Sequence, residues 1–221
     1  YSICSYKVGD YMFDLNNKTV VNRSFKIREI FKMINADKDL KRDAEVIKKI
    51  NLANVISKET LNIKSNESCR EIYVFNITLK EKRIPIDFIK TFDKNIELHT
   101  YFIFEHEDEF KELCIYRYVQ DSNIKRGRIY ESAWGNKESK ELPYCINICE
   151  IYNSFILNLV DLKIRENENI NDFLERLYNI EQLRKEISTL EKKAFKESQP
   201  RKKFDIGREV KIKKEKLKGL E

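Results

Sequence analysis

The chain has 221 residues and a formal net charge of +6, and 36% of its residues are charged against 41% hydrophobic. Its 13 Phe and 11 Tyr supply core material that a disordered chain lacks. Five Gly and three Pro are too few for a turn-dense β sandwich or barrel. No apolar run approaches the ~20 residues of a membrane span, and the N-terminus shows no secretory pattern. We therefore expect a cytoplasmic protein without membrane contact.

The first third of the chain is expected to begin with helices and to continue into a strand. Residues 1–11 show no clean period, so we interpret them as an extension or an expression remnant. Apolar residues at helical spacing predict helices over 26–35 and 39–50. Residues 55–65 are expected to form an irregular connector. Residues 71–80, apolar on both faces, predict a central strand.

The middle of the chain alternates between a helix and further strands. Pro85 is suited to the first turn of a helix that runs to about residue 96. Strands are expected over 100–105 and 113–119, joined by the acidic turn at 106–109 as a hairpin, and a fourth over 128–134. Together these elements predict an α+β fold with about four mainly antiparallel strands and helices on one face.

The last third reads as helices. After a helix over 145–159, a long helix carries apolar residues at steps of three and four, close to a heptad seam. The seam residues are Phe173, Leu177, Ile180, Leu183, Ile187, Leu190 and Ala194. The break at 198–200 and a basic helix over 203–218 predict an antiparallel hairpin or a projecting arm. We thus expect a core domain over 12–162 and a charged helical extension over 163–221.

The basic segment 201–218 accounts for the whole formal charge, because it holds nine basic and three acidic residues. Its Phe204, Ile206, Val210 and Leu217 are interpreted as the apolar residues of that helix. Such a helix neutralises phosphates of a nucleic acid, packs on an acidic partner protein, or serves only as a solvated arm. The residues predicted to bind nucleic acid or a partner are Arg201, Lys202, Lys203, Arg208, Lys211, Lys213 and Lys214.

One constellation suggests a metal-dependent nuclease. Asp87 or Asp93, followed by Glu109 and Lys111, has the residue types in which carboxylates hold Mg²⁺ and a lysine steadies the attacking water. Glu109 and Lys111 fall where a hairpin is expected to turn, however, and turns are charged because they are solvated. We therefore predict no catalytic residues.

No metal or cofactor is expected either. His106 lies among acidic residues without a second His or Cys at ligand spacing, so a solvated turn is favoured. Cys145 and Cys149 are one helical turn apart, but a structural zinc site needs a second pair, so we interpret them as buried thiols in a helix stripe. The odd number of cysteines, five, favours reduced thiols. No glycine-rich loop cradles a phosphate.

Several stretches carry a family resemblance over nearly the whole chain. They are MFDL from Met12, SKETLNIKS from Ser57, REIYVFNITLK from Arg70 and RIYESAW from Arg128, with the charged helices that follow. Together they resemble a prokaryotic family catalogued as domain of unknown function 4391. The resemblance implies that Met12 is close to the usual start of the family, and it carries no agreed activity or catalytic residues.

Members of the family are often encoded beside helicase and DNA methyltransferase genes of the restriction or phage-defence kind. The resemblance therefore implies a helicase or methyltransferase partner. We expect a non-enzymatic accessory or adaptor subunit of such a system that binds nucleic acid or a partner protein through its basic C-terminal helix. The alternatives are a metal-dependent nuclease and a self-associating coiled-coil module, although Pro200 favours an internal hairpin. The sequence leaves the oligomeric state open.

Overall fold

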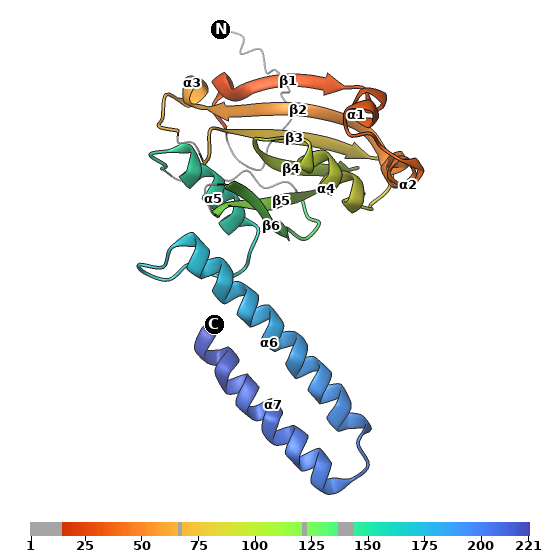
Figure 1. Ribbon diagram of the computed structural model, residues 1–221, viewed down its shortest axis with the longest axis vertical. Helices are drawn as coiled ribbons and strands as arrows, with labels where there is room; N and C mark the ends of the chain where they lie inside the picture. Colours follow the sequence, from red (N-terminus) through yellow and green to blue (C-terminus); the bar gives the residue numbers. More distant parts are fainter. Residues whose placement is uncertain (1–14, 66–67, 121–122, 137–143) are drawn as a thin grey trace. The chain divides into compact units, whose positions relative to one another are not determined.

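The computed structural model describes residues 15–65, 68–120, 123–136 and 144–221 (Figure 1). The chain divides into two compact units, one up to Val160 and the other over Asp161–Glu221. Residues 1–11, interpreted from the sequence as an extension, lie outside the described residues.

The first unit is built on one six-stranded sheet in which the strands follow their order in the sequence (Figure 1). The strands are β1 (Val20–Phe25), β2 (Ile47–Ser57), β3 (Glu71–Leu79), β4 (His99–His106), β5 (Glu109–Gln120) and β6 (Asn123–Glu131). Neighbouring strands are antiparallel except β3 and β4, which are parallel. Parallel neighbours need a crossover, and the segment that contains helix α4 supplies it.

Short helices connect and cover the strands. They are α1 (Ile27–Met33), α2 (Lys38–Asp43), α3 (Lys58–Leu61), α4 (Ile86–Lys94) and α5 (Ile148–Asn158), with 3-10 turns η1 (Asn17–Thr19) and η2 (Ala44–Val46). Polar caps begin several of them: the side chain of Asp37 accepts from Leu40 N, and Asn147 accepts from Glu150 N.

Aromatic residues fill one side of the sheet. The rings of Phe75 on β3 and Phe102 on β4 stack with centroids 5.7 Å apart, and Phe92 of α4 meets Phe75 edge-on at 5.2 Å. Phe31 of α1 packs against Phe88 of α4 at 6.1 Å. Helices α1 and α4 therefore cover this face, and edge and stacked ring pairs add to the free energy of simple burial.

Helix α5 covers the opposite face. Phe155 of α5 lies 4.7 Å from the ring of Tyr101 on β4, and Tyr152 lies 4.3 Å from the ring of His99. The prediction of helices on one face is therefore wrong. The physical reason is visible in β3, whose Ile72 and Val74 point away from Phe75 and are themselves buried, so that both faces of the sheet need a cover.

The mixed α+β class is confirmed, but the prediction of about four strands is too low. Strands β1 and β2 were missed, and the helix predicted over 39–50 ends at Asp43 in the structure. From Ile47 onward the backbone is extended and pairs with β1 on one side and β3 on the other. Pairing on both edges outweighs the helical spacing of a few apolar residues. The expected connector over 55–65 contains the end of β2 and the short helix α3.

The β4–β5 hairpin is confirmed at the predicted place. Strand β4 ends at His106 and β5 begins at Glu109, with Glu107 in the left-handed region at φ 54°.

The second unit consists of α6 (Ile170–Lys196) and α7 (Pro200–Leu220). Among the described residues, no helix has the length and apolar character needed to cross a membrane.

Candidate nucleic-acid interface

Helices α6 and α7 form an antiparallel hairpin. Asn169 caps the first turn of α6 by accepting hydrogen bonds from Asn171 N and Asp172 N, and Pro200 stands in the first turn of α7. Only residues 197–199 separate the two helices, so α7 runs back along α6 (Figure 1). This is the internal hairpin that the Pro200 break predicted.

The seam predicted as a coiled coil is used inside this hairpin. Ile180, Leu183 and Ile187 are buried on α6, and Val210 is buried on α7. Because α6 packs along α7 of the same chain, these residues contribute to the internal hairpin.

A buried arginine, Arg176, links the start of α6 to the end of α7, at the end of the hairpin opposite the connecting residues 197–199. Arg176 Nε lies 2.6 Å from Glu168 Oε1 and Nη2 lies 2.6 Å from Oε2, a two-pronged ion pair. Its Nη1 also donates to the carbonyl of Leu220, at 3.1 Å. The hydrogen bond from Arg176 lowers the pKa of Glu168 to about 2. Arg165 adds donors to the carbonyls of Gly219 and Leu220, so cations close the negative end of α7.

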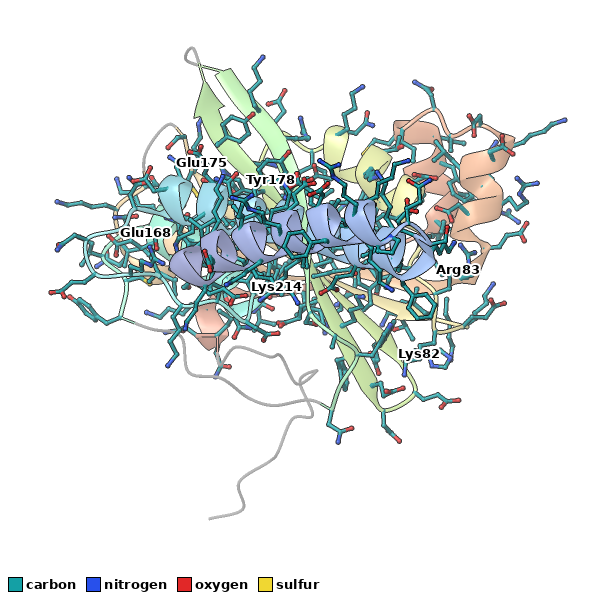
Figure 2. All side chains as sticks on the ribbon, turned by 90° about the horizontal axis from the view of Figure 1, so that it is seen from below. Lys82, Arg83, Glu168, Glu175, Tyr178 and Lys214 are labelled. Carbon is teal, nitrogen blue, oxygen red and sulfur yellow. The ribbon has the colours of Figure 1, made fainter. Side chains whose placement is uncertain are left out.

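Two of the seven predicted contact residues form ion pairs with carboxylates of α6. Lys213 Nζ lies 2.8 Å from Glu186 Oε2, and the hydrogen bond with Glu186 raises the pKa of Lys213. Lys214 Nζ lies 2.7 Å from Glu191 Oε1 (Figure 2, where Lys214 is labelled on α7). These two cations are partly neutralised within the hairpin.

The other five predicted contact residues are exposed, and no ion pair within the described residues involves them. They are Arg201, Lys202, Lys203, Arg208 and Lys211. Lysine and arginine side chains in water, without a carboxylate partner, are the groups that replace condensed counterions on a nucleic acid. The structure thus separates the predicted set into five available and two paired cations.

Helical geometry places several of these residues on one stripe. Arg201, Phe204, Arg208 and Lys211 are spaced by three, four and three residues, which confines them to about 80° of arc at about 100° per residue. Val210, the buried residue of α7, falls on the opposite side of the helix. The stripe therefore faces away from α6 and carries one aromatic ring between its cations.

The apolar residues of the basic helix differ in exposure. Val210 is buried, whereas 73% of the surface of Phe204 is exposed. Phe195, near the end of α6, is exposed by 87% and was not singled out from the sequence. The signal that could have found Phe204 was its place among the cations of the outer stripe.

In the first unit, which we call the sheet unit, a cluster of charged residues is buried, unlike the exposed cations of α7. Asp93 and Arg117 have fully buried side chains, and Arg117 Nη2 lies 2.6 Å from Asp93 Oδ1. Arg126 Nε lies 2.8 Å from Asp93 Oδ2, and the hydroxyl of Thr100 donates to Asp93 Oδ1. Arg126 also donates to the carbonyl of Lys94, the last residue of α4, and to that of Ile96 just after the helix. The cluster therefore ties α4 to β5 and β6, and its fully buried Asp93 and Arg117 offer no surface to a substrate.

The tyrosine and histidine beside this cluster are buried as well. The hydroxyl of Tyr152 donates to the carbonyl of Ile115 at 3.0 Å and accepts from Arg117 N at 3.1 Å. Burial raises the pKa of Tyr152 well above its ordinary value. Burial, assisted by the charge of Arg117, lowers the pKa of His99 to about 4. These groups join α5 to the sheet in protonation states that carry no charge near neutral pH.

The nuclease constellation is not assembled. Glu109 pairs with Lys82 at 2.5 Å, and Lys111 pairs with Glu131 at 3.0 Å. Asp93 contacts Arg117, which is eight residues from Glu109 along β5 and so roughly 25 Å away in an extended strand. Among the described residues, no group of three or more His, Cys, Asp or Glu side chains is placed to hold a metal ion, and this includes the turn around His106.

Asp87 lies in a different place, along an open acidic groove of about 510 Å³. The groove is lined by Asp37, Asp39, Leu40, Arg42, Asp43, Arg83 and Asp87. Arg83 Nη1 lies 2.8 Å from Asp43 Oδ1 and Arg42 Nη2 lies 3.0 Å from Asp39 Oδ1, so arginines neutralise much of its charge (Arg83 is labelled in Figure 2).

The described cysteines are thiols, as predicted. Cys145 precedes α5 instead of lying within it, and both Cys145 and Cys149 are partly exposed, so the prediction of two buried thiols in one helix stripe is wrong. A hydrogen bond with Cys149 and burial raise the pKa of Cys69. Cys4 lies outside the described residues.

Fold and site together define a mixed α+β sheet domain followed by a cationic helical hairpin. The family model described as Domain of unknown function (DUF4391) matches residues 13–217, which is most of the chain, and the protein belongs to this family. The resemblance seen in the sequence is thereby confirmed. Comparisons with the curated proteins and with the solved structures gave no match.

Proposed function

We propose that this protein is a non-enzymatic accessory subunit of a DNA-processing or phage-defence system, and that its C-terminal hairpin binds nucleic acid. The observation that carries the proposal is the set of five exposed cations on α7 without an ion pair in the described part of the chain. The accessory role, with a helicase or methyltransferase partner, rests on the gene neighbourhood that the family resemblance implies.

The charge pattern favours an anionic partner over a merely solvated arm. An arm that serves solubility needs charges of either sign, whereas α7 holds nine basic and three acidic residues. Two of the nine, Lys213 and Lys214, pair with carboxylates of α6. The excess of positive charge therefore faces the solvent.

Nucleic acid is favoured over an acidic partner protein because three of the five exposed cations, Arg201, Arg208 and Lys211, follow the helix in a line. Arg201 and Lys211 are ten residues apart, which corresponds to about 15 Å along the helix axis. A line of cations matches a ligand that carries negative charge at regular intervals, and such binding depends steeply on salt.

The test is fluorescence anisotropy of labelled DNA with the full chain across a salt series. In one variant Arg201, Lys202, Lys203, Arg208 and Lys211 are all changed to Gln. The matched control changes two arginines and three lysines of the sheet unit, all exposed, to Gln: Arg28, Lys32, Lys38, Lys41 and Arg70. Both variants lose the same net charge, so they differ only in where the cations are removed.

We expect the hairpin variant to bind much more weakly than the wild type. The slope of log affinity against log salt should fall by roughly 0.7 to 0.9 for each phosphate contact removed. The control should retain the wild-type slope. Equal weakening in the two variants, or binding that survives the hairpin substitutions, would refute the assignment.

A further inference from the structure

Two phenylalanines near the turn of the hairpin are exposed without an evident structural need. Phe195 on α6 has 87% of its surface in solvent and Phe204 on α7 has 73%. Single exposed apolar residues are common on protein surfaces. These two phenylalanines, however, lie at the same level of the hairpin and among cations, and this arrangement indicates a binding surface.

The register of the hairpin puts both rings at the same height. Glu186 on α6 meets Lys213 on α7. Nine residues further toward the turn on α6 is Phe195, and nine residues toward the turn on α7 is Phe204. Both rings therefore lie close to the connecting residues 197–199, where no third element of the hairpin covers them.

The same end of the hairpin concentrates positive charge. Residues 192–203 contain six basic residues and one acidic residue, and all six cations are exposed. The six are Lys192, Lys193, Lys196, Arg201, Lys202 and Lys203. The acidic residue, Glu197, accepts a hydrogen bond from Gln199 N at 2.8 Å. We call residues 192–204 the hairpin tip.

We propose that the hairpin tip binds single-stranded nucleic acid, with unpaired bases stacking on Phe195 and Phe204 while the surrounding cations contact phosphates. This inference rests on the proposed function and specifies its ligand. Exposed aromatic rings within a cationic surface are the combination that proteins use for single strands, because every unpaired base offers a π face. In a duplex those faces are stacked on the neighbouring base pairs, so the phenylalanine rings have no free base to stack on.

An anionic membrane is the main competing ligand for a basic, aromatic surface, and the arrangement of α7 disfavours it. A helix that lies on a membrane presents a continuous apolar face. On α7 the buried Val210 faces α6, and the outer stripe continues from Phe204 to Arg208 and Lys211. A stripe of cations leading away from the ring suits a phosphate backbone that continues past the stacked base.

The experiment measures binding of the full chain to labelled oligothymidylate and to the duplex that it forms with oligoadenylate. The variants are Phe195→Ala and Phe204→Ala. The control is Ile212→Ala, which removes another exposed apolar side chain of α7, 58% exposed, outside the tip. Phe204→Trp and Phe204→Leu separate aromatic stacking from simple hydrophobic contact.

We expect each Phe→Ala change to weaken binding of the single strand by about fivefold or more. The salt slope and the duplex affinity should not change, because no cation is removed. Phe204→Trp should keep the wild-type affinity, Phe204→Leu should lose it, and Ile212→Ala should have no effect.

The outcomes distinguish this inference from the proposed function. If the Phe variants bind like the wild type while the variant with five Gln does not, the hairpin binds nucleic acid electrostatically and the stacking proposal is overturned. Equal loss for single strand and duplex also overturns it. If the wild type binds neither DNA but binds phosphatidylserine vesicles through Phe195 and Phe204, both the proposed function and the stacking proposal fail.

Discussion

The Asp93–Arg117 pair of the sheet unit and the exposed cations of α7 place charged side chains in opposite environments. In the sheet unit, Asp93 and Arg117 are fully buried and their charged atoms are 2.6 Å apart. On α7 of the hairpin, Arg201, Arg208 and Lys211 are exposed, and no ion pair within the described residues involves them. The number of charges in a segment therefore says little about function until burial and pairing are known.

The difference has an energetic basis. A buried charge must be compensated because its desolvation costs several kcal/mol, so Asp93 has two arginines and a hydroxyl around it. An exposed cation has no such requirement and contributes little to stability. The buried cluster holds the fold together, and the exposed cations remain available to a ligand.

The largest expected effect is loss of stability on breaking the buried cluster. Asp93→Asn leaves Arg117 buried without its counter-charge, so we expect the free energy of unfolding to fall by about 3–5 kcal/mol. Asp39→Asn breaks the exposed pair with Arg42 and should leave stability unchanged within measurement error. Urea unfolding of the two variants measures the difference. Similar stabilities would mean that the two kinds of ion pair are equivalent.

The next effect depends on pH and involves His99. Its pKa is lowered from 6.5 to about 4 in the folded protein. Between pH 6.5 and pH 4, His99 is therefore protonated in the unfolded chain but stays neutral in the folded protein. The contribution of neutral His99 to the free energy of unfolding is complete above pH 6.5. It is lost as pH falls toward 4, by at most about 1.4 kcal/mol per pH unit. In His99→Asn this part of the pH dependence should disappear from urea unfolding curves. Parallel loss of stability in both proteins would contradict the assignment.

A smaller effect is expected within the hairpin itself. Arg176 is buried and holds Glu168 with two nitrogens, whereas Arg184 is exposed and pairs with Glu221. Arg176→Lys cannot reproduce the two-pronged geometry, and we expect opening of the hairpin to become easier by about 2 kcal/mol. Arg184→Lys should have no such effect. Amide hydrogen exchange of α7 reports the opening, and equal protection in the two variants would remove the proposed role of Arg176.

Substitutions of single lysines on α7 should change DNA binding clearly while having the smallest effect on stability. Lys211 and Lys213 are two residues apart on α7, but only Lys213 has a carboxylate partner on α6. We expect Lys211→Gln to reduce the salt slope for DNA by roughly 0.7 to 0.9, and Lys213→Gln to reduce it less. Neither change should alter thermal unfolding of the sheet unit. The reverse order of slopes would show that pairing does not decide which cations bind.

Some parts of the fold could be predicted because their signals are local. Residues 71–80 are rich in β-branched and aromatic residues on both faces of a strand, and the seam of α6 repeats at helical spacing, so composition identified the strand and periodicity the helix. Pro200 identified the break between the long helices. By contrast, β2 was partly assigned to a helix, because its identity depends on pairing with β1 and β3. Pairing partners that are distant in the chain leave no local pattern.

The candidate site was predicted only in outline. The charge of 201–218 identified α7, but the sequence could not separate Lys211, which is unpaired within the described residues, from Lys213, which is paired with Glu186. Nor could it show that Asp93 belongs with Arg117 and Arg126, which are 24 and 33 residues away in the chain. These are differences of three-dimensional neighbourhood between residues of the same type.

By itself, the sequence determined the mixed α+β class, the C-terminal helices, the family and the location of the positive charge, since each follows from local periodicity, composition or motif. Only the tertiary structure decided the number of strands, the covering of both faces of the sheet and the burial of Asp93. It also decided which cations of α7 are neutralised and that Phe195 and Phe204 are exposed. The physical reason is that pairing, burial and solvation depend on which residues meet in space.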